Sequence, residues 1–172
     1  SLSSIKLHKK IEKFEPDALI GTKWLTNKQK KSPLVIVNNI LINGQKAKGN
    51  ITVPDGVKEI GPYAFYDAFD LKSVKLPSSV TSIEQRAFFR CSSLTKINIP
   101  KEVTYIGAIP FSYTPWLEKN YDKNGLLIIN NTVIQAADIF GDLVIPNGVT
   151  KIGNNAFTGN TWLETVVLPD SI

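Results

Sequence analysis

The feature that most constrains the fold of this chain is a repeat with a period of 23 residues. Proline marks the period at Pro54, Pro77 and Pro100, and again at Pro146 and Pro169. Apolar residues keep the same step, each series skipping one unit before its last member: Phe65, Phe88, Phe111 and Phe157; Val57, Val80, Val103 and Val149; Ile60, Ile83, Ile106 and Ile152; Leu71, Leu94, Leu117 and Leu163. A period of roughly 20–50 residues is typical of solenoids, whose units bury their apolar edges against one another. The chain is therefore predicted to be a stack of short units.

A longer internal similarity is a multiple of this period. Residues 22–80 align without a gap with residues 114–172, with 22 identities in 59 positions. The offset of 92 residues is four times 23, so the similarity belongs to one repeat and marks no second domain. Units begin at residues 2, 25, 48, 71, 94, 117, 140 and 163, which gives seven full units and a fragment in a single solenoid domain, residues 1–172. Because a solenoid that stops in mid-unit exposes its core, we expect the natural protein to be longer.

Each regular unit is predicted to consist of two short extended segments and an apolar plug, as in Leu71–Ser93. Val74 and Leu76 alternate with polar residues, which indicates a strand with one buried face. Pro77 ends this strand because proline has no amide hydrogen to donate to a ladder; a turn and a second extended segment follow. Phe88 and the alanine before it then fill the interior. Corresponding strands of neighbouring units are predicted to pair in parallel, about 4.8 Å apart.

Two units depart from this pattern and are predicted to carry a short helix and a hairpin. In the segments TKWLTNKQKK and TPWLEKNYDK, Thr22 and Thr114 are suited to cap a helix, and Pro115 suits its first position. Polar residues occupy the usual first-strand positions there, so we expect the helix to replace that strand. The segments LVIVNNILI and LLIINNTVI then place apolar runs on both sides of an Asn-Asn pair, which predicts β-hairpins with tips at Asn38–Asn39 and Asn130–Asn131.

The unit L-x-x-V-x-L-P-x-x-V-x-x-I-x-x-x-A-F-x-x-C, read from Leu71 to Cys91, resembles the BspA-like leucine-rich repeat family. The segments LTKINIPKEVTYIGAIPF and VVLPDSI match the same pattern, and the resemblance covers essentially the whole chain. Local departures occur at His8, which stands in the place of the proline, and at Pro110, which replaces the alanine before phenylalanine. The resemblance implies a repeat solenoid: a right-handed, β-rich leucine-rich-repeat superhelix with parallel strands, short helical turns and two hairpin-bearing units.

This resemblance implies adhesion rather than catalysis. The family is common on the surfaces of gut and oral bacteria and of some protists, where it is associated with adhesion to host proteins and to other cells. For this chain it implies an extracellular or cell-surface location. The implied partner is a host extracellular protein, a glycan or another cell-surface protein. The family offers no catalytic residue to carry over, and its binding residues follow no fixed motif.

The residues themselves offer no catalytic pair, and no enzyme activity, cofactor or metal is expected. Cys91 and His8 are the only residues of their types, and three repeats separate them, which is about 14 Å of stacking alone. Cys91 shares its repeat position with small residues, which predicts a packed side chain instead of a reactive thiol. His8 is expected on a turn. Paired carboxylates such as Asp67 with Asp70 are expected to be solvated charges.

The three tryptophans are expected to pack in the core. Trp24, Trp116 and Trp162 each precede a leucine of the repeat frame. This shared position predicts that they plug the stack instead of binding a ligand.

The composition of the chain further limits the classes of partner and site that are expected. The net charge of +5 comes from scattered lysines, with the densest run at Lys28–Lys31, so nucleic acid is not expected as a partner. No apolar run approaches the roughly 18 residues of a membrane helix, so no membrane insertion is expected. A single cysteine excludes an intramolecular disulfide and a multi-cysteine zinc site.

The surface supplies the candidate binding residues. Outward positions of the first strands line up in two rows: Lys6, Thr52, Lys75, Asn98, Val144 and Val167 in one, and Ser4, Asn50, Ser73, Lys96, Lys119, Asp142 and Thr165 in the other. An ordinary solvated sheet fits these rows, and so does a recognition face whose lysines favour an acidic glycan or protein patch. The hairpin tips interrupt the regular surface and are the second candidate. The proposed binding residues are Lys75, Lys96, Asn98 and Lys119, with Asn38, Asn39, Asn130 and Asn131.

Three classes of function stay open at this point. The working hypothesis is a non-enzymatic adhesin that binds through its surface. The first alternative is a structural spacer whose repeats present another domain. The second is an accessory binding module of a surface hydrolase whose catalytic domain lies outside this sequence.

Overall fold

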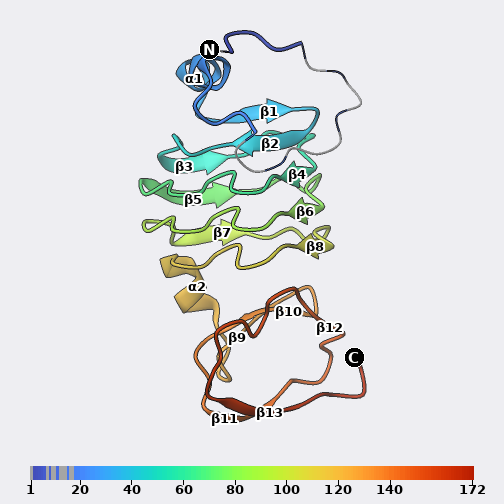
Figure 1. The fold of residues 1–172 in the computed structure, drawn as a ribbon. Helices are drawn as coiled ribbons and strands as arrows, with labels where there is room; N and C mark the ends of the chain where they lie inside the picture. Colours follow the sequence, from blue (N-terminus) through green and yellow to red (C-terminus); the bar gives the residue numbers. More distant parts are fainter. Residues whose placement is uncertain (1, 7, 9–10, 12–14, 16–17) are drawn as a thin grey trace.

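The computed structural model describes residues 2–6, 8, 11, 15 and 18–172, and it confirms a β-rich solenoid with a spacing of about 23 residues (Figure 1). Part of the first expected unit, including Leu7 and Phe14, lies outside the described residues. One backbone hydrogen bond nevertheless shows that Leu2 holds the same repeat position as Leu94. The backbone N–H of Trp24 donates to the carbonyl of Leu2 at 3.0 Å, and that of Trp116 donates to Leu94 at 2.8 Å.

The first strands of the regular units form a parallel sheet along one face of the stack. It consists of β3 (Gly49–Thr52), β5 (Leu71–Lys75) and β7 (Lys96–Asn98). After the second helix the row resumes as a separate parallel pair, β11 (Gly141–Val144) and β13 (Leu163–Val167). The prediction that equivalent strands pair in register across the repeat is therefore confirmed.

The second extended segments form a second sheet. Strands β2 (Ile40–Asn43), β4 (Glu59–Ile60), β6 (Ser82–Ile83) and β8 (Tyr105–Ile106) pair in parallel in that order. Strand β10 (Thr132–Ala136) pairs in the same way with β12 (Lys151–Ile152). Two faces of the solenoid are thus built from short strands, and irregular turns close each unit.

The two variant units carry the predicted helices and hairpins. Helix α1 (Lys23–Lys31) is capped by the Thr22 hydroxyl, and α2 (Pro115–Asn120) by that of Thr114, with Pro115 in its first turn. Strand β1 (Val35–Val37) pairs antiparallel with β2, and β9 (Leu126–Ile129) pairs antiparallel with β10. Both helices stand where regular units have their first strand, as predicted.

The core is a column of apolar side chains between the two sheets. Phe65, Phe88 and Phe111 are fully buried and stack on one another, with ring centres 5.0 Å and then 5.7 Å apart. Trp116 closes the column, because its ring centre lies 4.7 Å from that of Phe111. Stacked side chains of successive units therefore connect the repeats along the axis, as expected of a solenoid.

The stack is interrupted at α2. The five-stranded sheet ends at β8, and the sheets beyond the helix contain only later strands. Figure 1 shows the turns before α2 edge-on and the turns after it more nearly along their axis, so the solenoid bends here. A helix in place of the first strand and an antiparallel strand in place of the second remove the pairing that keeps regular units aligned.

Three expectations about individual residues are corrected. Lys119 lies in α2 and not in the sheet row, because the helix replaces the strand. Residues 2–6 form no strand, so Ser4 and Lys6 do not extend the rows. Trp162 is 64% exposed and stacks on Phe140, whereas Trp24 and Trp116 are buried. The difference arises because the two buried tryptophans stand in helices that pack inward, and Trp162 stands in a turn.

Candidate functional site

The predicted polar ladder exists on the first sheet. Its registers place Asn50 beside Ser73 and then Lys96, and Thr52 beside Lys75 and then Asn98. The side chains of Lys75, Lys96 and Asn98 are exposed. The ladder is therefore available to a partner over three units, and the helix that carries Lys119 borders it.

Most amides and hydroxyls of this ladder are already used within the fold. The Ser73 hydroxyl donates to the side-chain oxygen of Asn50 at 2.8 Å. The Asn98 amide accepts from the backbone N–H of Leu76 at 2.8 Å and donates to its carbonyl at 3.0 Å. Only the lysine ammonium groups extend beyond this network. The sheet face thus resembles an ordinary solvated surface with added positive charge.

The asparagine tips of the hairpins are explained by the backbone. Asn38 and Asn39 have φ values of 47° and 67°, and Asn130 and Asn131 have φ values of 46° and 60°. Two consecutive left-handed residues are the signature of the tight turn that best suits a β-hairpin, and asparagine tolerates this conformation better than other non-glycine residues. The turn alone therefore accounts for the choice of residue.

The first asparagine of each tip also ties its hairpin to the preceding unit. The Asn130 side-chain amide donates to the carbonyl of Val103 at 2.8 Å, with longer contacts to Pro100 and Lys101. The Asn38 amide reaches the carbonyls of His8 and Ile11 in the same way. The amides of Asn38 and Asn130 thus donate to turn carbonyls of the preceding unit, at the places where the hairpin replaces a regular strand.

We expect Asn130→Ala to destabilise the protein by about 1–3 kcal/mol, because it loses these hydrogen bonds and places alanine in a left-handed conformation. Asn130→Gly keeps the turn and loses only the hydrogen bonds, so it should cost about 1 kcal/mol less than alanine. Urea unfolding followed by circular dichroism measures both. Equal stability of the alanine variant and the wild type would contradict a structural role for this tip.

The only thiol is not placed for catalysis. Cys91 is fully buried, and its Sγ lies 3.0 Å from the carbonyl oxygen of Phe65. Burial raises the pKa of the Cys91 thiol to about 12, so it stays protonated at neutral pH. The expected packing role of this residue is confirmed.

The candidate carboxylates serve local contacts. Asp70 pairs with Lys48 at 2.8 Å, and the hydrogen bond and charge of Lys48 lower the pKa of Asp70. Asp67 lies 3.4 Å from Arg90. Among the described residues, no group of three or more His, Cys, Asp or Glu side chains is placed to hold a metal ion. Within the same part of the chain, the helices are too short or too polar to cross a bilayer.

A surface that the repeat pattern does not mark lies on the irregular turns of three successive units. We call it the aromatic–arginine ridge and define it by seven residues: Tyr63, Tyr66, Phe69, Arg86, Phe89, Arg90 and Tyr113. These residues lie in the same turns as the buried plugs Phe65, Phe88 and Phe111, and their side chains are exposed or half-buried. Tyr113 is 72% exposed and Phe69 is 48% exposed. The ridge is therefore a continuous strip of exposed and half-buried rings and guanidinium groups.

The rings of the ridge contact one another from unit to unit. Tyr66 stacks on Phe89, with ring centres 5.4 Å apart and planes only 3° from parallel. Tyr63 lies 5.4 Å from Tyr66, and Tyr113 meets Phe89 edge-on at 5.1 Å. Because each ring is held by its neighbours, the strip offers a partner a large apolar area that is already ordered.

Arg86 lies at the centre of the ridge and contacts two of its rings. Its guanidinium lies 5.6 Å from the ring centre of Tyr63 and 5.5 Å from that of Phe89. It also donates a hydrogen bond to the Tyr63 hydroxyl at 2.8 Å. The side chain remains exposed, so its charge is fixed in position and open to solvent.

Arg90 extends the ridge to its other border. Its guanidinium lies 5.8 Å from the ring centre of Phe69, and its Nε atom lies 3.4 Å from a carboxylate oxygen of Asp67. That buried oxygen accepts no hydrogen bond from the described residues. The same oxygen therefore makes a charge contact with Arg90 and accepts no hydrogen bond from the described residues.

Several residues of the ridge have a strained, left-handed backbone conformation. Tyr63, Arg86 and Tyr113 have φ values of 57°, 53° and 61°, in the left-handed region that favours glycine and asparagine. In a later unit the two equivalent left-handed positions hold Asn155 and Gly159. Bulky residues there cost of order 1 kcal/mol each, so their retention on three units points to a use for the side chains.

Two hollows flank the ridge. One, of about 500 Å³, lies toward α1 and is lined by Tyr63, Tyr66 and Asp67 with Lys46. The other, of about 550 Å³, lies toward α2 and is lined in part by Arg86, Phe89, Tyr113 and Glu118. A partner could therefore contact the ridge and extend into the hollow on each side of it.

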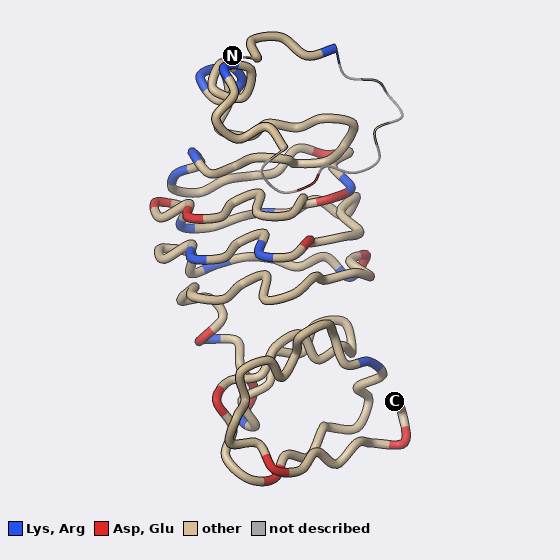
Figure 2. Tube along the Cα trace, viewed as in Figure 1, with Lys and Arg blue, Asp and Glu red and all other residues tan. Residues whose placement is uncertain are grey.

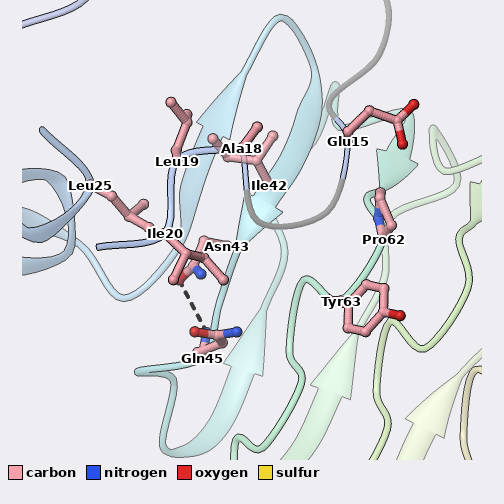
Figure 3. A pocket seen from close by; sticks show the side chains of 10 residues that line it. All are labelled: Glu15, Ala18, Leu19, Ile20, Leu25, Ile42, Asn43, Gln45, Pro62 and Tyr63. Atoms are coloured by element: carbon pink, nitrogen blue, oxygen red, sulfur yellow. Dashed lines mark hydrogen bonds between the residues drawn. The ribbon is translucent and has the colours of Figure 1, made fainter. Parts of the chain in front are cut away.

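A third pocket, near α1, is smaller than the two hollows beside the ridge. Figure 3 shows Leu19, Leu25 and Ile42 around it, with the backbone N–H of Gln45 donating to the side chain of Asn43 at 3.4 Å. Its volume of about 30 Å³ is much smaller than those of the two hollows beside the ridge.

Charge does not mark any single face of the molecule. In Figure 2 the Lys and Arg positions are dispersed along the chain and interleaved with Asp and Glu. The aromatic–arginine ridge is thus distinguished by its ring and guanidinium contacts and not by net charge. In the sequence its signal was the aromatic or arginine residue on each side of Ala-Phe, in YAFY and RAFF.

Comparisons with known proteins agree with the repeat pattern. A family model described as BspA type leucine rich repeat region (6 copies) matches residues 25–139 and 128–172. A search of curated proteins found no match.

Solved structures of bacterial leucine-rich repeat proteins are similar to this chain. A leucine rich cell surface protein from Faecalibacterium prausnitzii is 29% identical, with a TM-score of 0.45, over 76% of this chain and 38% of that one. A leucine rich repeat protein from T. pallidum is 26% identical, with a TM-score of 0.42, over 69% of this chain and 58% of that one. One from Bacteroides ovatus is 27% identical, with a TM-score of 0.39, over 71% and 34%. The chain spans between 34% and 58% of the length of these three proteins.

Proposed function

Because this chain belongs to the family of BspA-type leucine-rich repeat proteins, we propose that it is a non-enzymatic binding protein that mediates adhesion at the cell surface or in the extracellular space. The proposed partner is a host extracellular protein, a glycan or another cell-surface protein. The observation that carries the proposal is the aromatic–arginine ridge, an ordered strip of exposed rings on the outer surface of three units. A surface that spans three units supports this proposal, because solenoids bind partners over several successive repeats.

The ridge is favoured over the flat sheet by the chemistry of its side chains. Tyrosine and arginine are enriched among the few residues that dominate binding energy, whereas lysine is depleted from interfaces. The ridge side chains are also held by ring contacts, so a partner that binds them loses little additional side-chain freedom. We therefore place the main contact at Arg86, Phe89 and Tyr113.

The lysines of the sheet have a supporting role in this proposal. Lys75, Lys96 and Lys119 are exposed, and Asn98 lies beside Lys75. Exposed charges mainly speed the encounter with a partner of opposite charge and contribute less to the final affinity. The exposed tips at Asn38–Asn39 and Asn130–Asn131 are proposed as secondary contacts at the ends of the surface.

Two matched variants test this proposal. The ridge variant combines Arg86→Ala, Phe89→Ala and Tyr113→Ala, and the sheet variant combines Lys75→Ala, Lys96→Ala and Lys119→Ala. Each is compared with the wild type on a panel of immobilised extracellular-matrix proteins and on a glycan array. We expect the ridge variant to lose about 100-fold or more in affinity. The sheet variant should mainly show a slower, more salt-dependent association.

Two results would overturn the proposal. If the wild type binds no member of the panel, the repeats are better explained as a spacer. If the ridge variant binds as well as the wild type while the sheet variant does not, recognition lies on the lysine ladder. Thermal unfolding of both variants controls for folding, and since the substituted side chains are exposed or half-buried, both should keep a cooperative transition.

A further inference from the structure

The bend at α2 leaves two strands of the second sheet with an open edge. Among the described residues, β8 pairs only with β6, and β9 pairs only with β10. Strand β9 is the antiparallel arm of a hairpin, so it cannot extend the ladder that ends at β8 as a further parallel strand, and among the described residues it forms no antiparallel pair with β8. The open edge of β8 lies at the break, where residues of β8 and of the β9–β10 hairpin line the space between the two sheets.

The backbone of β8 shows what this edge lacks. In the regular ladder the carbonyls of Lys58 and Thr81 each accept from the next unit, and the carbonyl of Ile83 accepts from Gly107 at 2.8 Å. At β8 the series stops. No backbone N–H of the described residues reaches the carbonyls of Thr104 and Ile106. Two acceptors of a sheet edge are therefore free to pair with another strand.

A hollow lies at this break. Its volume is about 250 Å³, and Ile106, Ile129 and Ile134 line it with other residues of β8 and the β9–β10 hairpin. Lys101 and Lys151 also line it, and none of the described residues around it is acidic. The depression thus combines apolar side chains, two positive charges and an open strand edge.

We propose that this edge binds an extended segment of another protein, which carries an aliphatic side chain between acidic residues. The segment would add to β8 as a further strand and donate its backbone N–H groups to the carbonyls of Thr104 and Ile106. Its aliphatic side chain would enter the hollow, and its carboxylates would lie near Lys101 and Lys151. Addition of a strand to an exposed edge gives affinity through the main chain and specificity through such pockets.

Charge complementarity favours an acidic segment over a second copy of this chain as the occupant of the β8 edge. Pairing of β8 with β8 of a second copy would bring Lys101 and Lys151 of one copy against those of the other, and like charges at close range oppose such contact. An acidic segment removes this repulsion and uses both lysines. The proposal goes beyond the proposed function, because it uses a different surface from the aromatic–arginine ridge.

A peptide library tests the proposal directly. The probe is a display library of random 10-residue peptides, selected on the immobilised full chain and counter-selected on Thr104→Trp, whose indole fills the hollow. The matched control is Thr81→Trp, the equivalent position one unit earlier, where β8 already covers the edge. A second variant, Lys101→Glu with Lys151→Glu, removes the charge without adding bulk.

We expect the selected peptides to carry Val, Ile or Leu between Asp or Glu residues. Their binding should be lost in Thr104→Trp, weakened about tenfold or more by the two glutamates, and unchanged in Thr81→Trp and in the ridge variant. Methylation of alternate peptide nitrogens should abolish binding only at the positions that donate to β8. Thermal unfolding confirms that each variant is folded.

Three results would overturn the proposal. The first is that no peptide survives the counter-selection. The second is that selected peptides bind the glutamate variant and the wild type equally well. The third is self-association of the wild type in analytical ultracentrifugation that Thr104→Trp abolishes, which would assign the edge to a second copy of the chain. Because the ridge variant keeps peptide binding, failure of the proposed function remains distinguishable from failure here.

Discussion

Replacement of Phe88 by alanine is expected to destabilise the protein by about 3–5 kcal/mol. The Phe88 ring is fully buried and stacks between Phe65 and Phe111, so its removal leaves a cavity at the middle of the core column. In a solenoid each unit is stabilised by its two neighbours, so this cavity also weakens the coupling between the units on either side. Urea unfolding followed by circular dichroism should show an earlier and broader transition.

The matched control for this substitution is Phe140→Ala. Phe140 is 72% exposed and contacts Trp162 on the surface, so its loss should change stability by about 0.5 kcal/mol or less. Equal effects of the two substitutions would contradict the stacked phenylalanine core.

Replacement of Trp116 by alanine is expected to cost about 3–5 kcal/mol as well. Trp116 is 7% exposed and lies 4.7 Å from Phe111, at the point where α2 replaces a strand and the sheets are interrupted. Side-chain packing of Trp116 in the shared core, together with the Asn130 hydrogen bonds, therefore connects the units on the two sides of the bend. Thermal unfolding monitored by near-ultraviolet circular dichroism reports the loss.

Trp162→Ala serves as the control for Trp116→Ala, because the two tryptophans hold the same repeat position. Trp162 is 64% exposed, so its removal should leave the unfolding temperature nearly unchanged. A large loss of stability in Trp162→Ala together with a small one in Trp116→Ala would show that α2 does not join the two parts of the stack.

The elements that the sequence predicted well depend on local chemistry or on the repeat itself. Thr22 and Thr114 cap their helices as expected, because a hydroxyl before a first turn satisfies a free backbone N–H wherever the helix lies. The period predicted the parallel pairing of β3, β5 and β7, since equivalent positions must face the same way in every unit. These features need no knowledge of the rest of the molecule.

The features that the sequence did not predict depend on how units meet. Strand β9 runs opposite to the regular strands and does not pair with β8, and the 23-residue frame records neither strand direction nor pairing. Lys119 stayed in the predicted sheet row although a helix was expected there, and Trp162 shared a position but not a surrounding helix. A repeat frame assigns equivalent positions, and it does not show which of them keep equivalent neighbours.

The aromatic–arginine ridge was missed for a related reason. Its residues stand in turns whose left-handed backbone points side chains outward at positions such as Arg86 and Tyr113. Neither the alternation of a strand nor the period of a helix applies to such turns. Neither pattern therefore places the aromatic residues beside a buried Ala-Phe pair, and the structure leaves Tyr63, Tyr66 and Phe89 half-buried at the surface.

The most direct test of the proposed function is the footprint of a bound partner, measured by hydrogen–deuterium exchange. The wild type is compared free and in complex with whichever member of the matrix-protein or glycan panel binds it. If the aromatic–arginine ridge is the recognition surface, protection will be concentrated in residues 63–69, 86–92 and 109–113. Protection confined to residues 50–52, 73–75 and 96–98 would contradict it and assign binding to the lysine-bearing sheet.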